Sequence, residues 1–265
     1  MKCNTQTSTG SFQNCQDVST GEVDVAVATS DVVLNAYNGT GKFADIGKLD
    51  NLRVIGAVYT SVLSGVALKS SGLTYIHDLL GKRVAVGPAA SATENATLAA
   101  FGVMGIDSSN TSLENLGLGD GADSVGDGMC RALDAAFGFA GLPIGGQLNL
   151  AATKEIQVLD MTQEEIDKVL AGNAAYIQTK IPAGTYTGQD NDANTFGVKC
   201  LIIVTADMDA DLVYDLCKAM NEHTEELAAG NALLKDMTDP SFLCTQMPIP
   251  LHDGAQKYYS EQGLI

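Results

Sequence analysis

The sequence predicts an α/β protein of two similar lobes, and three observations support that fold class. Strand-like and helix-like segments alternate along the chain, as in βαβ units with parallel sheets. The phrase Gly21–Val27 is echoed by Ala132–Phe137, and each leads from a helix-like stretch into small or hydroxylic residues. The chain has 265 residues, 45% of them hydrophobic, a size at which α/β cores begin to divide. We therefore expect two α/β lobes with a ligand cleft between them.

The first lobe is predicted as alternating strands and helices. Ser30 and Asp31 supply polar groups for the start of its second helix, and Asn38–Gly41 has the composition of a turn that ends it. A run of small residues then predicts two short strands rather than one long strand. In order, the predicted elements are the strand Lys2–Thr7, the helix Ser11–Thr20, the strand Val23–Ala28, the helix from Ser30 to about Tyr37, and the strands Arg53–Tyr59 and Gly65–Leu68.

The second lobe opens with a short helix and turn over Ile76–Arg83, which leads into the apolar strand Val84–Gly87. The residues Thr162–Glu165 have the pattern of a helix N-terminal cap. The remaining elements predicted for this lobe are the helix Ser91–Gly102, the helix Asp123–Leu133, the strand Asp134–Phe139 and the helix within Asp160–Leu170.

The chain then returns to the first lobe. The predicted elements are the strand Gly197–Val204, a long amphipathic helix over Asp207–Leu227, and an extended tail over Met247–His252. No low-complexity linker separates the lobes, so we expect a hinge of crossing strands. The expected domains are residues 1–80 as the first part of lobe one, residues 81–192 as lobe two, and residues 193–265 as the return of lobe one.

Charge and hydropathy exclude several classes of partner. The net charge is −17, from 32 acidic and 15 basic residues, so the clustered cations that bind nucleic acid or an anionic membrane are lacking. We interpret this charge as favouring solubility in an extracytoplasmic protein. No apolar run approaches the ~20 residues of a transmembrane helix, and we expect no membrane insertion. The start, Met1–Gln6, lacks the apolar core of a signal peptide.

Residues that bind metals or form disulfides are scattered. The six cysteines form no Cys-x-x-Cys pair, so we expect buried free thiols, with a Cys3–Cys15 bridge as the less favoured alternative. The histidines lie on separate elements without ligands at metal-binding spacing, which favours structural roles for them. They are His77, His223 and His252. We expect no metal site and no cofactor.

Two loops have the composition of anion-binding sites. Gly87–Thr93 lies between a strand and a helix, which leaves backbone N–H groups and hydroxyls facing one point, and Thr7–Ser11 has the same arrangement in lobe one. Gly87–Thr93 has no following lysine, as a nucleotide-binding loop would, and Ser91 lacks both the flanking glycines of a nucleophile elbow and an evident base. Two such loops at equivalent places predict a ligand-binding protein and not an enzyme.

Five stretches, in order over nearly the whole chain, carry a resemblance to a known family. They are Ser8–Ser11, Ser30–Asp31 with Ala36–Gly39, Gly81–Gly87 with Ser91–Glu94, Ile181–Asp190, and Ile249–Ala255 with Tyr258–Tyr259. Together they resemble the TAXI family of solute receptors, extracytoplasmic binding proteins that serve tripartite ATP-independent periplasmic (TRAP) transporters. The resemblance implies a type II periplasmic-binding-protein-like fold. The family's signal peptide and first strand–helix unit have no counterpart, so we expect lobe one to be truncated at its N-terminus.

The resemblance implies a periplasmic or extracytoplasmic receptor that delivers a small amino acid or organic acid, with glutamate- or glutamine-like ligands favoured, to the membrane subunits of a TRAP transporter. We expect it to be a monomer. The arginines add a constraint, because Arg53, Arg83 and Arg131 lie outside the two loops and a second ligand carboxylate would lack a bidentate partner. An α-amino acid fits better, with its carboxylate on loop N–H groups and its ammonium near Glu94 or Asp31.

The expected ligand contacts come from both lobes. They are Ser8, Thr9, Gly10, Ser11, Ser30 and Tyr59 from lobe one, Ser91, Thr93 and Glu94 from lobe two, and Phe139, Ala140 and Gly141 as an apolar wall. Structural alternatives stand beside these roles: Thr93 as a helix cap, Tyr59 as a core residue and Glu94 as a solvated first-turn acid. For Asp31 the helix-cap interpretation is favoured, so it is left out of the contact set.

Two other functions remain open on the same fold. One is a ligand-binding sensor, or a remnant that no longer serves transport, which the truncated first lobe would fit. The other is an enzyme similar to the thiamine-pyrimidine synthases, which would need a cofactor lysine or a histidine and cysteine cluster. The absence of such a cluster from the sequence favours the binding protein.

Overall fold

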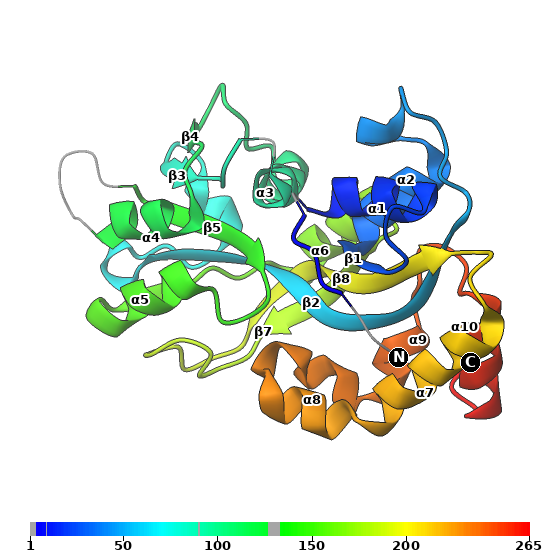
Figure 1. Cartoon of the computed structure of the whole chain (residues 1–265). Helices are drawn as coiled ribbons and strands as arrows, with labels where there is room; N and C mark the ends of the chain where they lie inside the picture. The colour runs from blue at the N-terminus through cyan, green and yellow to red at the C-terminus, as the bar shows by residue number, and fades with distance from the viewer. Residues whose placement is uncertain (1–3, 9, 90, 127–132) are drawn as a thin grey trace. The chain divides into compact units, whose positions relative to one another are not determined.

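The computed structural model describes residues 4–8, 10–89, 91–126 and 133–265, and it contains two compact units (Figure 1). Unit 1 is the chain up to Thr60 together with Val198–Ile265, and unit 2 is Ser61–Gly197. The chain passes from one unit to the other along two long strands, β2 (Leu52–Leu68) and β8 (Ala193–Thr205). The predicted α/β class is confirmed.

The unit boundaries differ from the expected divisions at 80/81 and 192/193. Residues 61–68 belong to unit 2 because this half of β2 pairs with β5 (Ala135–Ala140) and β6 (Ile156–Val158). The later residues of β8 belong to unit 1, where they pair with β1 (Ala26–Thr29). One part of each long strand therefore belongs to the core of unit 1 and the other part to the core of unit 2. The sequence pattern does not show the position at which a strand passes from one core to the other.

In unit 1, β1 pairs antiparallel with β8, from Ala26 opposite Ile203 to Thr29 opposite Cys200. The expectation of parallel sheets is wrong here. Unit 1 also contains a set of helical segments. They are α1 (Ser11–Thr20), α2 (Ser30–Asn38), η1 (Gly41–Phe43), α7 (Ala210–Glu222), α8 (Thr224–Gly230), η4 (Ala232–Thr238), α9 (Pro240–Cys244) and α10 (Asp253–Glu261).

Helices α1 and α2 form because each places small apolar residues on one face. Cys15 and Val18 of α1 are fully buried, as are Val33 and Ala36 of α2, and all four belong to one apolar cluster. The three-residue spacing in each helix puts both residues on the same side. A second cluster in unit 1 joins α7 and α10 to Ile55 of β2.

In unit 2, β5 lies between β2, to which it is antiparallel, and β3 (Arg83–Ala85), to which it is parallel. The parallel pairing expected from the sequence is confirmed for β3 and β5, and β3 also pairs in parallel with β4 (Ser112–Glu114), a strand that the sequence analysis did not predict. The other elements of this unit are η2 (Lys69–Ser71), η3 (Ile76–Leu79), α3 (Ala92–Val103), α4 (Leu118–Gly126), α5 (Gly145–Thr153), α6 (Gln163–Gly172) and β7 (Tyr176–Ile181).

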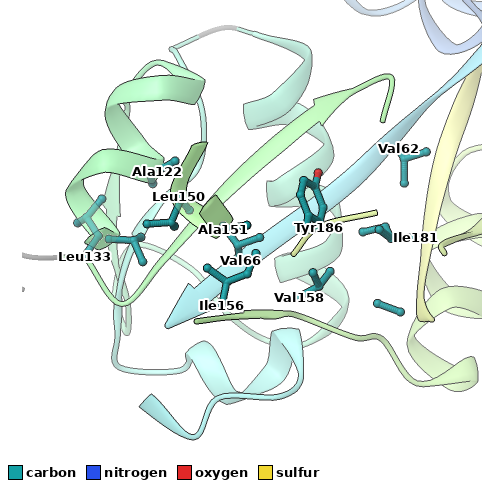
Figure 2. Packing of buried hydrophobic residues seen from close by; sticks show 14 residues of the cluster. Val62, Val66, Ala122, Leu133, Leu150, Ala151, Ile156, Val158, Ile181 and Tyr186 are labelled. Atoms are coloured by element: carbon teal, nitrogen blue, oxygen red, sulfur yellow. The ribbon is translucent and has the colours of Figure 1, made fainter. Parts of the chain in front are cut away.

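A hydrogen-bonded polar network lies inside the apolar core of unit 2. The Tyr186 side chain lies among the apolar residues of this core (Figure 2). Its hydroxyl donates to Gln147 Oε1 over 2.8 Å and accepts from the Ile144 backbone N–H over 3.1 Å. Gln147 also accepts from the Ser64 hydroxyl and donates to the Ser64 carbonyl. The stretch Ile181–Asp190 is therefore anchored in the core through Tyr186.

Several predicted elements are wrong. Asn4–Thr7 forms no strand and is exposed, because these polar residues would bury nothing by pairing. The two strands predicted over Arg53–Leu68 are one continuous strand. The helix predicted over Asp207–Leu227 is broken at His223, between α7 and α8. The helix predicted over Asp123–Leu133 begins earlier, as α4, and its residues 127–132 lie outside the described residues.

Candidate functional site

The candidate loop of unit 1 leads into α1 through an uncapped helix start. Ser8 is exposed and its hydroxyl accepts from the N–H of Gly10, while Thr9 lies outside the described residues. Gly10 is the N-cap residue, with φ 129, and supplies no side-chain cap. The first-turn N–H groups of Ser11, Phe12 and Gln13 have no carbonyl partner within the helix. They are donors of the kind that bind anions.

The start of α1 is tied to the end of β1. The Ser11 hydroxyl accepts from the Thr29 backbone N–H over 3.1 Å, and Asn14 Nδ2 donates to the Val27 carbonyl over 2.7 Å. Because α2 begins at Ser30, directly after Thr29, the N-termini of α1 and α2 meet at this contact. Ser30, 2% exposed, is therefore close to Ser11 in the fold, as the expected site requires.

Tyr59, the third expected contact in unit 1, is half-buried on β2. Burial raises the pKa of its phenol well above the usual value, and a hydrogen bond with Cys200 adds to the rise. The phenol is therefore neutral at physiological pH. This half-buried, hydrogen-bonded position is compatible both with Tyr59 as a core residue and with Tyr59 as a ligand contact.

The candidate loop of unit 2 follows β3 and requires glycine at its first position. Gly87 has φ +100, and a Cβ added there would lie 2.6 Å from Thr93 Cβ. Ser91 is the N-cap of α3, and its hydroxyl accepts from the Glu94 backbone N–H over 3.1 Å. The first-turn N–H groups of Ala92 and Thr93 are the donors left without a partner in the helix geometry.

Thr93 connects α3 to the end of β5. It is 5% exposed, and its hydroxyl accepts from the Phe139 backbone N–H over 3.2 Å. The structure thus brings Thr93 together with the expected apolar wall, in which Phe139 is buried and Ala140 and Gly141 are half-buried. The buried hydroxyl of Thr93 holds this wall in place.

Glu94 is held by a residue that the sequence analysis missed. Asn115 Nδ2 donates to Glu94 Oε1 over 2.7 Å and to the Gly87 carbonyl over 3.0 Å. Asn115 directly follows β4. A polar residue at the end of a strand could have been recognised as a site candidate, but the sequence analysis did not predict this strand. Asn115 closes the loop by joining its first residue to the first turn of α3.

The profile of the NMT1-like family matches residues 1–263 of this chain. The chain belongs to the NMT1-like family. Its structure is similar to that of the periplasmic aliphatic sulphonate-binding protein SsuA of Escherichia coli, with 13% identity and a TM-score of 0.51, over 96% of this chain and 70% of that one. This similarity shows that the NMT1-like chain has the two-lobe α/β fold of periplasmic solute-binding proteins.

Two further solved structures are more distant matches to the NMT1-like chain. The alkanesulfonate-binding protein SsuA of Xanthomonas axonopodis pv. citri, bound to MOPS, has 14% identity and a TM-score of 0.46, over 95% of this chain and 70% of that one. The substrate-binding protein of an amino acid ABC transporter has 16% identity and a TM-score of 0.42, over 83% of this chain and 75% of that one.

The cysteines and histidines of the NMT1-like chain have structural surroundings where they are described. Cys15, Cys200, Cys217 and Cys244 are buried free thiols, so the Cys3–Cys15 bridge is not formed. Cys3 and Cys130 lie outside the described residues. His77 and His223 contact glutamates, and buried His252 caps α10. Across the described ranges, no cluster of metal ligands is found, and no helix is long and apolar enough to cross a membrane.

A buried lysine in unit 1 was also missed. Lys199, on β8, is 3% exposed, and its ammonium donates to the carbonyls of Phe242 and Thr245 over 2.8 and 2.9 Å. The ammonium also lies 4.4 Å from the centre of the Phe242 ring. Burial lowers its pKa to about 8. These contacts hold the end of α9, and they explain how a lysine is accommodated within an apolar strand.

Proposed function

We propose that this NMT1-like protein is an extracytoplasmic solute-binding receptor of the TAXI type, which delivers a small amino acid or organic acid to the membrane subunits of a TRAP transporter. The observation that carries the proposal is the pair of loops that lead into α1 and α3, one in each unit, on a solute-binding fold; the loop before α3 follows the strand β3, and the loop before α1 follows the exposed, strandless residues Asn4–Thr7. Each loop ends in a helix whose first-turn N–H groups suit a carboxylate. The five stretches that resemble the TAXI family support the transporter class.

The ligand class follows from the charges available in the loops. A carboxylate fits the N–H groups at the start of α1 or α3. A second carboxylate needs a cation, and Arg53 instead donates to the carbonyls of Asp50 and Leu52. A ligand with one carboxylate next to a polar or cationic group therefore fits better than a dicarboxylate. Of the glutamate- or glutamine-like ligands that the TAXI resemblance implies, glutamine meets this condition, because glutamate carries a second carboxylate.

Ligand-dependent thermal stability tests the proposal. A ligand at a hundredfold excess over its dissociation constant stabilises a protein by about 2.7 kcal/mol, which raises the melting temperature of a chain of this size by roughly 5–10 °C. The panel contains amino acids, their deaminated acids and an alkanesulfonate, the ligand class in the name of SsuA. A rise with one class identifies the ligand. No rise with any compound would contradict a receptor for these classes.

Two further measurements separate this receptor from the alternatives. A sensor or a transport remnant would bind the ligand but would not support uptake by reconstituted membrane subunits. An enzyme similar to the thiamine-pyrimidine synthases would convert substrate and show the absorbance of a covalent cofactor. The proposal expects ligand-dependent uptake and neither of those enzyme signals.

A further inference from the structure

An unpartnered carboxylate oxygen lies at the start of α2. Oδ1 of Asp31 is buried and has no hydrogen-bond partner. Asp31 lies in the first turn of α2, whose N-cap residue Thr29 also makes no side-chain capping bond. A buried carboxylate oxygen without a donor is costly, and buried polar groups in native proteins nearly always have a hydrogen-bond partner, in the protein itself or in a bound water, ion or ligand. The favoured interpretation of Asp31 as a helix cap does not explain this oxygen.

The surroundings of Asp31 are those of the candidate loop in unit 1. The contact between Ser11 and Thr29 places the start of α1 beside the start of α2. Burial, and to a smaller extent the negative charge of Asp31, raises the pKa of the Cys15 thiol to about 12, so the carboxylate acts one turn into α1. A carboxylate and the uncapped N–H groups of α1 are therefore neighbours in a single unit.

The other candidate for an ammonium partner is already engaged. Glu94 Oε1 accepts from Asn115 Nδ2 over 2.7 Å. That bond belongs to the closure of its loop, which also joins Asn115 to the Gly87 carbonyl. Of the two carboxylates, Asp31 is the one with a buried oxygen that still lacks a donor.

We propose that Asp31 binds the ammonium group of the ligand and makes the receptor selective for α-amino acids over the same acids without the amine. This inference rests on the proposed receptor function and specifies its ligand class. An ammonium offers three N–H donors and a positive charge, which satisfy the orphan oxygen and neutralise the carboxylate. The ligand carboxylate then lies on the N–H groups of Ser11, Phe12 and Gln13, as in an α-amino acid, where the two groups are separated by one carbon.

The test compares Asp31→Asn with the parent protein, by calorimetric titration with L-glutamate against glutarate and L-alanine against propionate. The parent is expected to prefer the amino acid of a pair. Asp31→Asn should lower affinity for the amino acid by about 10- to 150-fold, the size of a lost interaction with a charged group, and leave affinity for the deaminated acid unchanged or higher. The control Asp24→Asn, at an exposed carboxylate of the same unit, should keep the preference.

Each other outcome has a defined meaning. An equal loss for both members of a pair, or no loss, would overturn the role of Asp31 and leave the receptor function standing. Parent protein that binds neither member of any pair would overturn both. A measurement without ligand adds an independent check, since removing an unpaired buried charge should leave the melting temperature of Asp31→Asn equal to or above that of the parent. A fall would mean that the carboxylate has a partner inside the protein, which contradicts the proposal.

Discussion

Replacing Tyr186 by Phe tests the polar network that anchors the stretch Ile181–Asp190. The substitution keeps the ring in its apolar surroundings and removes only the hydroxyl. That hydroxyl donates to Gln147 and accepts from the Ile144 N–H, and Tyr186 is 1% exposed. Water therefore cannot replace the lost partner, and two buried groups are affected by a single change.

The magnitude follows from what each group retains. The Ile144 N–H loses its acceptor, at about 1–3 kcal/mol for a buried orphan donor. Gln147 Oε1 loses one of two bonds, because the Ser64 hydroxyl still donates to it over 2.6 Å, and this adds about 0.5–1.5 kcal/mol. Tyr186→Phe should therefore lower the free energy of unfolding by about 1.5–4.5 kcal/mol.

Tyr259 of unit 1 provides a matched control. It is also fully buried, but its hydroxyl bond is to the Ile55 carbonyl, which keeps a second donor in the Cys217 thiol. Tyr259→Phe should cost only about 0.5–1.5 kcal/mol. Urea unfolding is followed by far-ultraviolet circular dichroism, since the chain has no tryptophan. Hydrogen exchange assigns each loss to its unit, with faster exchange expected in α5 for Tyr186→Phe. A smaller loss for Tyr186→Phe than for Tyr259→Phe would refute the network.

Three more outcomes are expected. Gly87→Ala should destabilise more than Gly81→Ala, because both have positive φ but the added Cβ meets Thr93 at 2.6 Å only at Gly87; equal midpoints in urea would contradict this. Thr93→Val should cost about 1–3 kcal/mol by leaving the Phe139 N–H unsatisfied, and unchanged stability would show that water replaces the hydroxyl. The contribution of Lys199 to stability should rise between pH 8 and about 10.4, since its pKa is lowered to about 8 by burial and it holds fewer protons folded than unfolded there, while the thiols and phenols whose pKa burial raises act in the opposite direction. Comparison with Lys199→Met isolates the effect, and parallel pH profiles for the two proteins would exclude it.

Elements with strong local signals were predictable from the sequence. The helix predicted over Ser11–Thr20 is present with the same bounds, and Gly21, directly after it, takes the left-handed conformation that ends it. The pattern at Thr162–Glu165 forms the expected capping box of α6. Both signals lie within one turn of the helix end that they define, so no tertiary contact was needed to recognise them.

Elements that depend on distant partners were not predictable. The small residues after Tyr59 suggested a break, but β2 continues through them because they are needed for packing. A Cβ on Gly65 would lie 2.5 Å from the Phe137 ring, and the Ser64 hydroxyl bonds to Gln147. Both partners are far away in the sequence. Glycine and serine in this strand therefore reflect the neighbouring strand and helix, which a local pattern cannot reveal.

The candidate site shows the same division between local and distant causes. The two loops were found because small hydroxylic residues directly before a helix are a local pattern; the strand predicted before the loop of unit 2 is present as β3, and the strand predicted before the loop of unit 1 is not formed at Asn4–Thr7. Which hydroxyls are available to a ligand depends on contacts across the fold: those of Ser11 and Thr93 accept from the backbone N–H groups of Thr29 and Phe139. Their role is to fix the loops. The proposed ligand recognition therefore rests on the first-turn N–H groups and on Asp31, whose buried Oδ1 has no hydrogen-bond partner.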